Sequence, residues 1–371
     1  IRITSMALTT VRPQGMGFVT GRRNLVINGA MQVAQRGTST TGLGTSHNTY
    51  HTVDRFKLLT GSDATAGRFT MSQSSVTDLA GFSNAIKLQC TTADTSIAAG
   101  EACVLSTVFE GQDLQRLLNT STSTKAFTVS FYAKANESRA VALEVRTSHG
   151  TNRQIAKLFT ITSSWQRFEF NVPAAASGMQ FGNDNSNDLQ LNWWQHAGST
   201  YAGGTLSTDW EGATNANRAT GVGSLFASTN NFFEITGVQM ELGENASDFE
   251  HRSYGEELAL CQRYFTKVLV GDTNGSVLLS RFADSTNEYT GGLSFPVTMR
   301  VTPTSSSPDV NRFHKPGQTY DSISSMSNNS RSTDRAHINL TPGSNTTASN
   351  SRSGLVGSSS GNGSFNYDAE M

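Results

Sequence analysis

The sequence has few charged residues for a chain of 371 residues. Asp, Glu, Lys and Arg make up 15% of it, and 28 basic residues nearly balance 29 acidic ones. The formal net charge of −1 leaves no basic footprint for nucleic acid. No apolar run approaches the length of about 20 residues that a membrane-spanning helix needs. We therefore expect neither nucleic-acid binding nor membrane insertion.

Cysteine is also scarce, with only Cys90, Cys103 and Cys261. The count is odd and the spacing matches no metal site, so buried free thiols are the expected state. Ser, Thr, Asn and Gly are abundant instead, a composition typical of many short strands joined by polar turns.

Alternating apolar residues run through most of the chain. Examples are Phe127, Val129 and Phe131, and then Val141 and Val145 on either side of Leu143. Turn residues separate such runs at intervals of about ten residues, as in a β-sandwich. The pattern predicts a mainly β fold.

The stretch 233–265 combines strand and helix signals. Its apolar alternation slips by one residue at Thr236-Gly237, which predicts a β-bulge. Ser253 followed by Glu256 is a capping-box pattern and predicts a helix start. Three apolar side chains then fall on one predicted helical face: Leu258, Cys261 and Phe265.

Several phrases of the sequence resemble bacteriophage virion fibre and tail fibre proteins. They are NLVINGAMQVAQRG (Asn24–Gly37), VDRF (Val53–Phe56), TGVQMELG (Thr236–Gly243), FEHRSYGEEL (Phe249–Leu258), CQRYF (Cys261–Phe265), FPVTMRVTPT (Phe295–Thr304) and FNYDAEM (Phe365–Met371). The order of VFEGQDL (Val108–Leu114), FTVSFYAKA (Phe127–Ala135) and TSSWQRFEFNVP (Thr162–Pro173) resembles the jelly roll of carbohydrate-binding modules. The pattern predicts a β-sandwich, and this resemblance implies that it is a jelly roll.

The resemblance implies four parts. Residues 1–44 are expected to be an extended virion-attachment segment that orders on a partner, and residues 45–252 a jelly-roll β-sandwich. Residues 253–266 are expected to form a junction helix, and residues 267–371 a small β-rich tip domain. A domain as small as the tip is marginal alone, so we expect a homotrimer with the junction helices, through Leu258, Cys261 and Phe265, near its axis.

Four aromatic residues gather in a loop-rich stretch before the closing strand: Trp193, Trp194, Tyr201 and Trp210. Exposed aromatic rings stack on sugar faces, but a trimer interface or the domain core would explain them too. Adjacent residues of a strand point to opposite faces, so only one of Trp193 and Trp194 is expected in the core.

The remaining chemical signals are weak. Asp184, Ser186 and Asp188 alternate like ligands of a calcium loop, but an Asx-rich turn is the simpler interpretation. Asp209 and Glu211 are paired carboxylates that could act as acid and base on a glycosidic bond, but in a Gly-rich loop they are more simply turn residues. Gly357–Gly361 matches the G-x-S-x-G pattern of a hydrolase nucleophile, but it lacks the strand and helix that a nucleophile elbow needs. We expect no cofactor and no enzymatic activity.

The hypothesis from the sequence is a structural fibre subunit of the virion that attaches to host-surface polysaccharide and contacts other virion proteins through its N-terminal segment. The tip is favoured over the aromatic stretch as the host-contacting surface. One alternative is a capsid-decorating head fibre that stabilises the particle or aids loose attachment. A glycan depolymerase is the other, although no β-helix repeat is visible.

Overall fold

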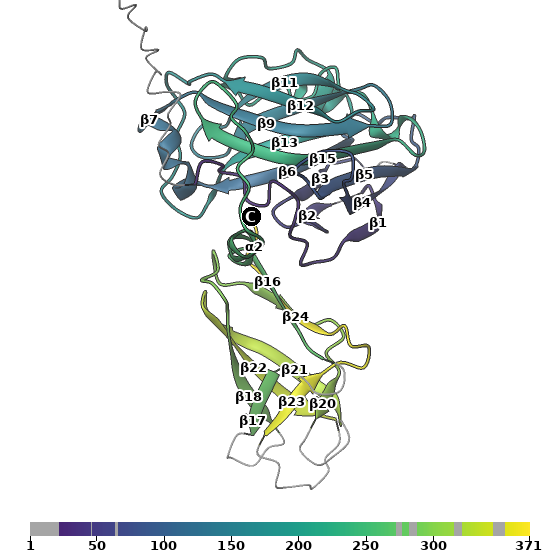
Figure 1. Ribbon diagram of the computed structural model, residues 1–371, viewed down its shortest axis with the longest axis vertical. Coiled ribbons are helices and arrows are strands. Elements are labelled where there is room, and N and C mark those ends of the chain that lie inside the picture. The colour runs from purple at the N-terminus through teal and green to yellow at the C-terminus, as the bar shows by residue number, and fades with distance from the viewer. Residues whose placement is uncertain are drawn as a thin grey trace, which may run out of the picture.

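A computed structural model describes residues 22–45, 47–63, 66–271, 277–281, 288–314, 321–343 and 353–371. The chain is mainly β, as predicted, and forms two bodies stacked along the long axis of the molecule (Figure 1). The larger body is a β-sandwich, and the smaller one carries the C-terminal strands. No helix among the described residues is long and apolar enough to cross a membrane.

The larger body contains two antiparallel sheets. The six-stranded sheet has the order β1 (Ser39–Leu43), β4 (Arg68–Ser75), β5 (Asn84–Thr92), β15 (Phe232–Leu242), β9 (Phe127–Ala135), β12 (Gln166–Val172). The seven-stranded sheet has the order β14 (Glu211–Gly212), β11 (Arg153–Ile161), β10 (Arg139–Thr147), β13 (Asn187–Ala197), β6 (Ala102–Glu110), β3 (Lys57–Thr60), β2 (Asn48–Tyr50). Hairpin neighbours such as β4 and β5 alternate with pairs far apart in sequence, such as β15 with β5 and β13 with β6, and this crossed connectivity is that of a jelly roll.

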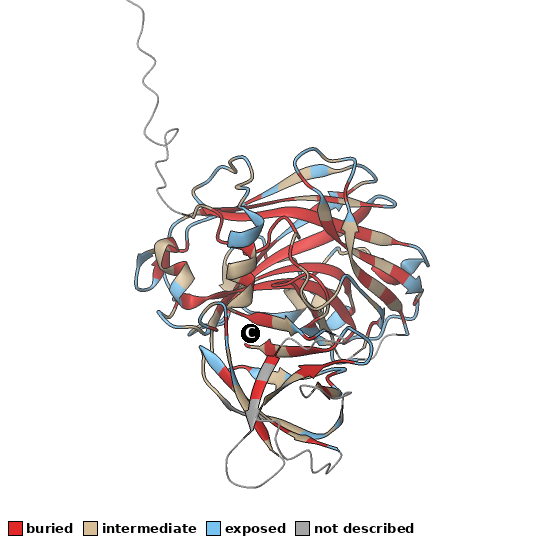
Figure 2. Ribbon diagram, turned by 60° about the horizontal axis from the view of Figure 1, so that its bottom comes forward, coloured by how far each residue is buried: buried red, intermediate tan, exposed pale blue. Residues whose placement is uncertain are grey.

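The main core lies between these sheets, and Figure 2 shows buried residues along their strands. The alternating residues Phe127, Val129 and Phe131 all point into it, as do Val141 and Val145. Period-two side-chain direction therefore explains which face of each strand is buried. Cys90, Cys103 and Cys261 are buried free thiols, as expected.

The predicted bulge is present in β15. The pairing of β15 with β9 shifts register between Thr236 and Gln239. Gly237 has φ +61°, and a Cβ there would come within 2.7 Å of the Phe82 ring and 2.8 Å of the Tyr132 ring. Glycine is needed at this position because both the backbone conformation and the close approach exclude a side chain.

The described part of the N-terminal segment belongs to the jelly roll, contrary to the expectation for residues 1–44. Leu25 and Met31 lie in the main core, and the Leu25 amide donates to the Met240 carbonyl over 2.9 Å. Strand β1 then forms an edge of the six-stranded sheet. The sandwich thus begins near residue 24, and residues 1–21 lie outside the described residues.

Helices in the described part of the chain are few and short. The capping box predicted at Ser253 is present and starts α2 (Tyr254–Gln262). A 3-10 helix, η2 (Gly111–Leu117), follows β6. The other helical segments are α1 (Ser199–Ala202), η3 (Asn215–Asn217) and η4 (Leu225–Ala227).

The junction helix is shorter than predicted, and its apolar face is covered within the chain. It ends at Gln262, so Phe265 lies in the following strand and not on the helix. Cys261 is fully buried in a small cluster with Ile27 and Val33, and Leu258 packs against that cluster. The N-terminal segment covers this face, a long-range contact that helical periodicity could not reveal.

The smaller body combines a barrel and a sheet. The closed barrel has the order β17 (Val277–Arg281), β18 (Tyr289–Ser294), β22 (Arg335–Pro342), β21 (Asp321–Arg331), β20 (Arg312–His314), β23 (Ser353–Gly357). The three-stranded sheet has the order β16 (Phe265–Leu269), β24 (Ser364–Asp368), β19 (Thr304–Ser306). The larger body has in addition a separate two-stranded hairpin of β7 (Leu118–Thr120) and β8 (Ser123–Thr124). Barrel and sheet share one hydrophobic core, which includes Phe313 and Tyr367.

Buried ion pairs join the two bodies. Arg55 of the sandwich pairs with Glu370 next to the C-terminus, and both side chains are at most 4% exposed. Glu110 accepts from the Arg263 Nε and Nη2 atoms over 2.8 and 2.7 Å and also from the Tyr264 hydroxyl. Removing either partner of the Arg55–Glu370 pair would leave an uncompensated buried charge, so this pair ties the two bodies together.

Candidate functional site on the outer face of the seven-stranded sheet

Residues 198–224, between β13 and β15, lie over the outer face of the seven-stranded sheet. Backbone hydrogen bonds hold this insertion down, from Gly198 to the Glu101 carbonyl over 2.8 Å and from Gly223 to the Ala140 carbonyl over 2.9 Å. Trp194 points to this outer face but is only 1% exposed, because Ala219 and neighbouring insertion residues pack on it. The insertion thus covers part of this sheet face and forms a side of a concave surface beside Trp194.

Glu144 organises the floor of this surface. Its carboxylate is fully buried and accepts four hydrogen bonds. Two come from Arg218, over 2.8 and 3.0 Å, one from the Trp194 indole over 3.0 Å, and one from the Asn192 amide over 3.0 Å. The Arg218 guanidinium also lies 4.7 Å from the Trp194 ring centroid and 5.8 Å from that of Tyr201. These hydrogen bonds connect the insertion, through Arg218, to the side chains of strands β10 and β13.

A cavity of about 220 Å³ opens beside this network. Its apolar lining is aromatic and aliphatic and includes Trp194 and Tyr201, whose ring centroids are 5.3 Å apart. Its polar lining residues are Arg146, Gln190 and Arg218, together with Asn48 and Thr60. The volume is below the roughly 300–1,000 Å³ of pockets for drug-sized ligands, so a small ring such as one sugar unit suits it.

Arg146 is a half-buried cation that lines the cavity. In the described part of the chain its guanidinium makes no hydrogen bond or ion pair. Burial and the nearby Arg218 charge lower the pKa of Arg146 below its ordinary value, with Glu144 opposing them. The side chain is therefore a partly desolvated cation with free donors directed at a cavity.

Only two of the four predicted aromatic residues meet in this site. Trp194 and Tyr201 line the cavity, while Trp193 points into the core between the sheets, where it contacts Phe131. The prediction that the adjacent tryptophans face opposite sides is confirmed, but both are buried. Trp210 packs against the edge of the main core, and its indole donates to the Pro173 carbonyl over 2.9 Å.

Sequence reasoning missed Glu144, Arg146 and Arg218. A signal for the first two was available, because they alternate with the apolar Leu143 and Val145 and so must share the other face of the same strand. Nothing in the sequence indicated that Arg218, from the insertion, would pair with Glu144.

The candidate calcium residues serve a turn. Asp184 accepts from the Ser186 amide over 2.9 Å, which is an Asx-type turn bond. Asp188 is 1% exposed and accepts from the Gly182 amide, with the His149 ring 3.4 Å away. No group of three or more His, Cys, Asp or Glu residues arranged for a metal occurs among the residues that the structure describes.

The carboxylate pair of the insertion also serves a turn. Glu211 accepts from Ser207, from the Asn217 amide over 3.0 Å and from the Gln154 amide over 3.2 Å. The first two of these hydrogen bonds chiefly lower the pKa of Glu211. Asp209 is exposed. A carboxylate stabilised in its ionised form by turn contacts is poorly suited to act as a general acid.

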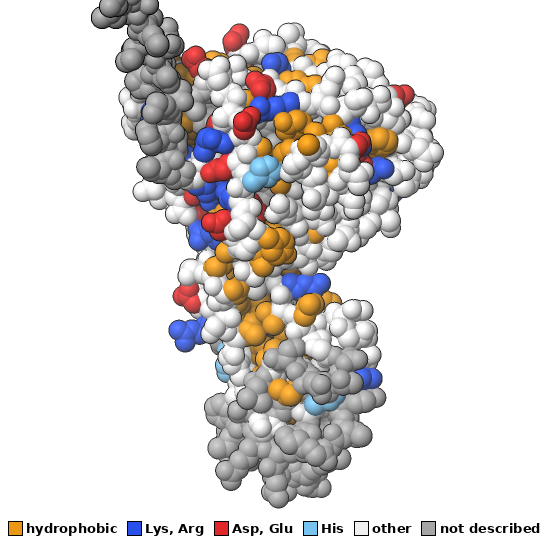
Figure 3. Space-filling model, viewed as in Figure 1, with side chains coloured by type: hydrophobic (Ala, Val, Ile, Leu, Met, Phe, Trp, Pro, Cys, Tyr) orange, Lys and Arg blue, Asp and Glu red, His pale blue; other side chains and the backbone are white. Residues whose placement is uncertain are grey.

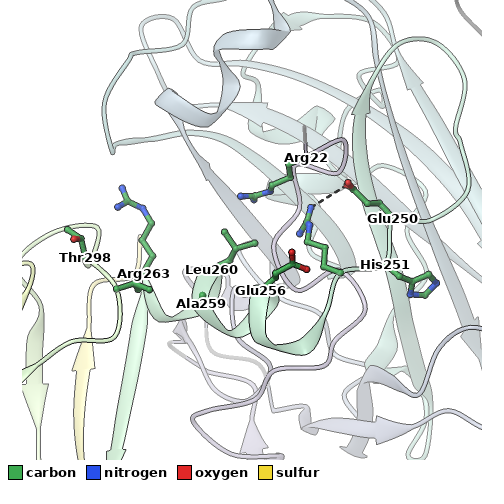
Figure 4. A pocket seen from close by; sticks show the side chains of 10 residues that line it. Arg22, Glu250, His251, Glu256, Ala259, Leu260, Arg263 and Thr298 are labelled. Atoms are coloured by element: carbon green, nitrogen blue, oxygen red, sulfur yellow. Dashed lines mark ion pairs between the residues drawn. The ribbon is translucent and has the colours of Figure 1, made fainter. Parts of the chain in front are cut away.

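A second concave surface lies at the neck between the two bodies. It is a groove of about 680 Å³ lined mainly by the outer side of α2 and the chain around it, including Arg22, Glu250, Ala259, Leu260 and Val297. Figure 4 shows Leu260 directed from α2 toward Arg22, whereas His251 points away. On the face drawn in Figure 3, hydrophobic side chains gather along this neck.

No protein-family model and no curated protein matches the sequence. Solved structures with similar chain paths include the enzymatically active domain of tailspike protein 4 from bacteriophage CBA120, at 12% identity and TM-score 0.31, covering 59% of this chain and 21% of that one. A family 11 carbohydrate-binding module of a Clostridium thermocellum cellulase, at 10% identity and TM-score 0.28, covers 58% and 98%. A family 30 carbohydrate-binding module, at 12% identity and TM-score 0.29, covers 60% and 98%.

This chain therefore spans about a fifth of the length of the tailspike chain and nearly the whole of each binding module. Structural similarity at these low identities and TM-scores does not indicate a function for this chain. The fold assignment rests on the sheet order and strand register described above.

Proposed function

We propose that this protein is a non-enzymatic structural subunit of a bacteriophage virion fibre that attaches to a host-surface glycan. The observation that carries the glycan part is the cavity beside Trp194, with Tyr201 as an aromatic wall and the donors of Arg146, Gln190 and Arg218 around it. Aromatic rings contact the apolar faces of sugar rings, and guanidinium and amide donors satisfy sugar hydroxyls.

The fibre part rests on the sequence phrases that resemble virion fibre proteins. In the folded chain several of them meet at the neck: Arg55 contacts Glu370, and the Asn28 amide donates to Glu257. Arg252 donates to the Val26 carbonyl over 3.1 Å. Phrases scattered over the chain thus build one junction between a sandwich and a tip, which supports a shared architecture rather than chance similarity.

We place the sugar contact on the jelly roll rather than on the tip. The sequence favours the tip, because it lies farthest from the presumed docking end. Part of it (272–276, 282–287, 315–320 and 344–352) lies outside the described residues. The jelly-roll cavity combines aromatic walls with free donors, which is the chemistry that sugar recognition requires.

Affinity at one such site should be low. Hydrogen bonds to neutral groups contribute about 1 kcal/mol each, so a small cavity would bind a sugar in roughly the millimolar range. A homotrimer and several fibres on one particle would raise the avidity. The proposal therefore includes a trimer, with α2 and its groove near the threefold axis, and attachment to other virion proteins through residues 1–21.

The test is binding of the purified full chain to an array of bacterial surface polysaccharides. Tyr201→Ala should abolish the strongest signals, because it removes the aromatic wall and keeps the Glu144 network. Trp165→Ala is the matched control, since Trp165 is a half-buried aromatic residue just before β12 of the other sheet. Failure of the wild-type chain to bind any polysaccharide would refute the glycan part of the proposal.

A further inference from the structure

The charges around the Trp194 cavity do not balance. Two guanidinium groups, those of Arg146 and Arg218, face one carboxylate, that of Glu144. Arg218 binds Glu144 with two parallel hydrogen bonds, and the Trp194 and Asn192 donors also bind its Oε2 atom. Among the described residues Glu144 makes no hydrogen bond or ion pair to Arg146, so its charge is paired with Arg218.

The neighbours of Arg146 on its own sheet cannot neutralise it either. The strand register places Arg146 between Gln190 of β13 and Gln154 of β11. Gln154 is already occupied with the insertion, donating to Ser207 over 2.7 Å and to the Thr214 carbonyl over 3.0 Å. Gln190 lines the cavity and carries no charge. The site is left with one surplus positive charge.

We propose that this cavity recognises an anionic sugar, one that carries a carboxylate or a phosphate or sulfate ester placed to pair with Arg146. The inference rests on the proposed glycan-binding function and specifies its ligand class. The guanidinium fork binds a planar or tetrahedral anion through two parallel hydrogen bonds.

The surroundings favour an anion over a neutral ligand. Arg146 is partly desolvated, and the positive Arg218 nearby lowers the pKa of Arg146. A bound anion would supply both hydrogen-bond acceptors and a counter-charge to Arg146, whereas a neutral sugar would supply acceptors alone. The sugar ring would contact the Tyr201 side of the cavity, and its acidic substituent would lie toward Arg146 and Gln190, which line the same cavity.

A surface arginine that merely keeps the protein soluble is the plain alternative. Such a side chain extends its charge into bulk water. Arg146 instead lies on β10, in the interior of the seven-stranded sheet between β11 and β13, and lines a walled cavity. This placement is what distinguishes it from the exposed Arg335 at the start of β22, which serves as a control.

The experiment is isothermal titration calorimetry of the full chain with linkage-matched pairs of oligosaccharides. Each pair holds an acidic member and its neutral counterpart: β-1,4-glucuronan and cello-oligosaccharides, oligogalacturonate and its methyl ester, sialylated and desialylated glycans. A sulfated cello-oligosaccharide distinguishes a sulfate ester from a carboxylate as the anion. Variants are Arg146→Gln, Arg146→Lys and, as the control for loss of one positive charge, Arg335→Gln.

We expect at least one acidic member to bind about tenfold to a hundredfold more tightly than its neutral partner, as for a charge-assisted hydrogen bond. Arg146→Gln should remove that difference, Arg146→Lys should keep part of it, and Arg335→Gln should keep all of it. Added salt should weaken binding of the acidic member only. Melting temperatures of the variants verify that each is folded.

Three results would overturn the inference. Equal binding of acidic and neutral partners would do so while leaving the glycan-binding proposal in place. Acidic preference that survives Arg146→Gln would place the anion contact elsewhere. If no member of any pair binds the folded wild-type chain, the proposed function fails and the inference fails with it.

Discussion

Arg55 and Glu370 form an ion pair although 315 positions separate them in the chain. Arg55 comes from the turn that precedes β3, and Glu370 is the penultimate residue of the sequence. The Arg55 guanidinium also lies 3.4 Å from the Tyr264 ring centroid and donates to the Val108 carbonyl over 2.7 Å. The C-terminal end of the tip is thereby tied into the sandwich.

Loss of the acidic partner at this junction should destabilise the protein strongly. Glu370→Ala leaves Arg55 buried without its counter-charge, which typically costs about 3–5 kcal/mol. Denaturant unfolding of the full chain measures the change. The exposed Glu244→Ala is the control and should stay within about 0.5 kcal/mol of wild type.

The double variant Arg55→Met/Glu370→Met separates charge from packing in this prediction. It removes both charges, so its stability should recover a large part of the loss. Equal stability of Glu370→Ala and wild type would mean that the two bodies are not held by this pair.

Stability should depend on pH through Asp54. Burial raises the pKa of Asp54 from 3.8 to about 6, against the opposing effects of Arg36 and of hydrogen bonds from Gln35. Between these values the folded state holds the proton more tightly than the unfolded state, so this contribution to stability falls as pH rises from about 4 to 6. At 1.36 kcal/mol per pKa unit the loss is roughly 3 kcal/mol.

Comparison with Asp54→Asn isolates this effect, since the variant cannot titrate at that position. The free energy of unfolding of wild type relative to Asp54→Asn should decrease between pH 4 and pH 7 and then level off. A wild-type minus Asp54→Asn difference that rises with pH would contradict the assignment.

Two tryptophans of the aromatic stretch, Trp193 and Trp210, should differ in their contribution to stability. Trp193 is fully buried between Phe56 and Phe131, so Trp193→Ala should cost about 3–5 kcal/mol. Trp210 is only partly buried and makes one hydrogen bond, so Trp210→Ala should cost roughly 1–2 kcal/mol. Thermal or denaturant unfolding measures both losses of stability. Similar losses for the two variants would show that the two residues are not packed as described.

Assembly should depend on the outer side of α2. Ala259 lines the neck groove, and Ala259→Glu places a charge there while leaving the buried Cys261 face intact. Light scattering at micromolar concentration should show a trimer for wild type and a smaller species for Ala259→Glu. Leu242→Glu is the control, because Leu242 is an apolar residue that is already 45% exposed on the sandwich. A monomeric wild type would remove the trimer from the proposal.

Local patterns predicted local structure well in this chain. The phase slip at Thr236-Gly237 is a bulge, and Ser253 caps a helix, because each depends on neighbouring residues alone. Alternation likewise placed Trp193 and Trp194 on opposite faces of β13.

Contacts between distant segments were beyond those patterns. The sequence did not reveal that Ile27 would cover the inner side of α2, so that side was assigned to a trimer interface. It did not reveal that the insertion would bury Trp194, nor that Arg218 would occupy Glu144 and leave Arg146 free. The candidate site depends on these long-range pairings, and only the fold supplies them.

Competition for attachment tests the central claim most directly. Host cells are incubated with the purified full chain, and the adsorption rate of virions of the phage that is proposed to carry this protein is then measured. Wild-type protein should slow adsorption in a dose-dependent way, Trp165→Ala should act like wild type, and Tyr201→Ala should have little effect. Unchanged adsorption at saturating wild-type protein would contradict the account.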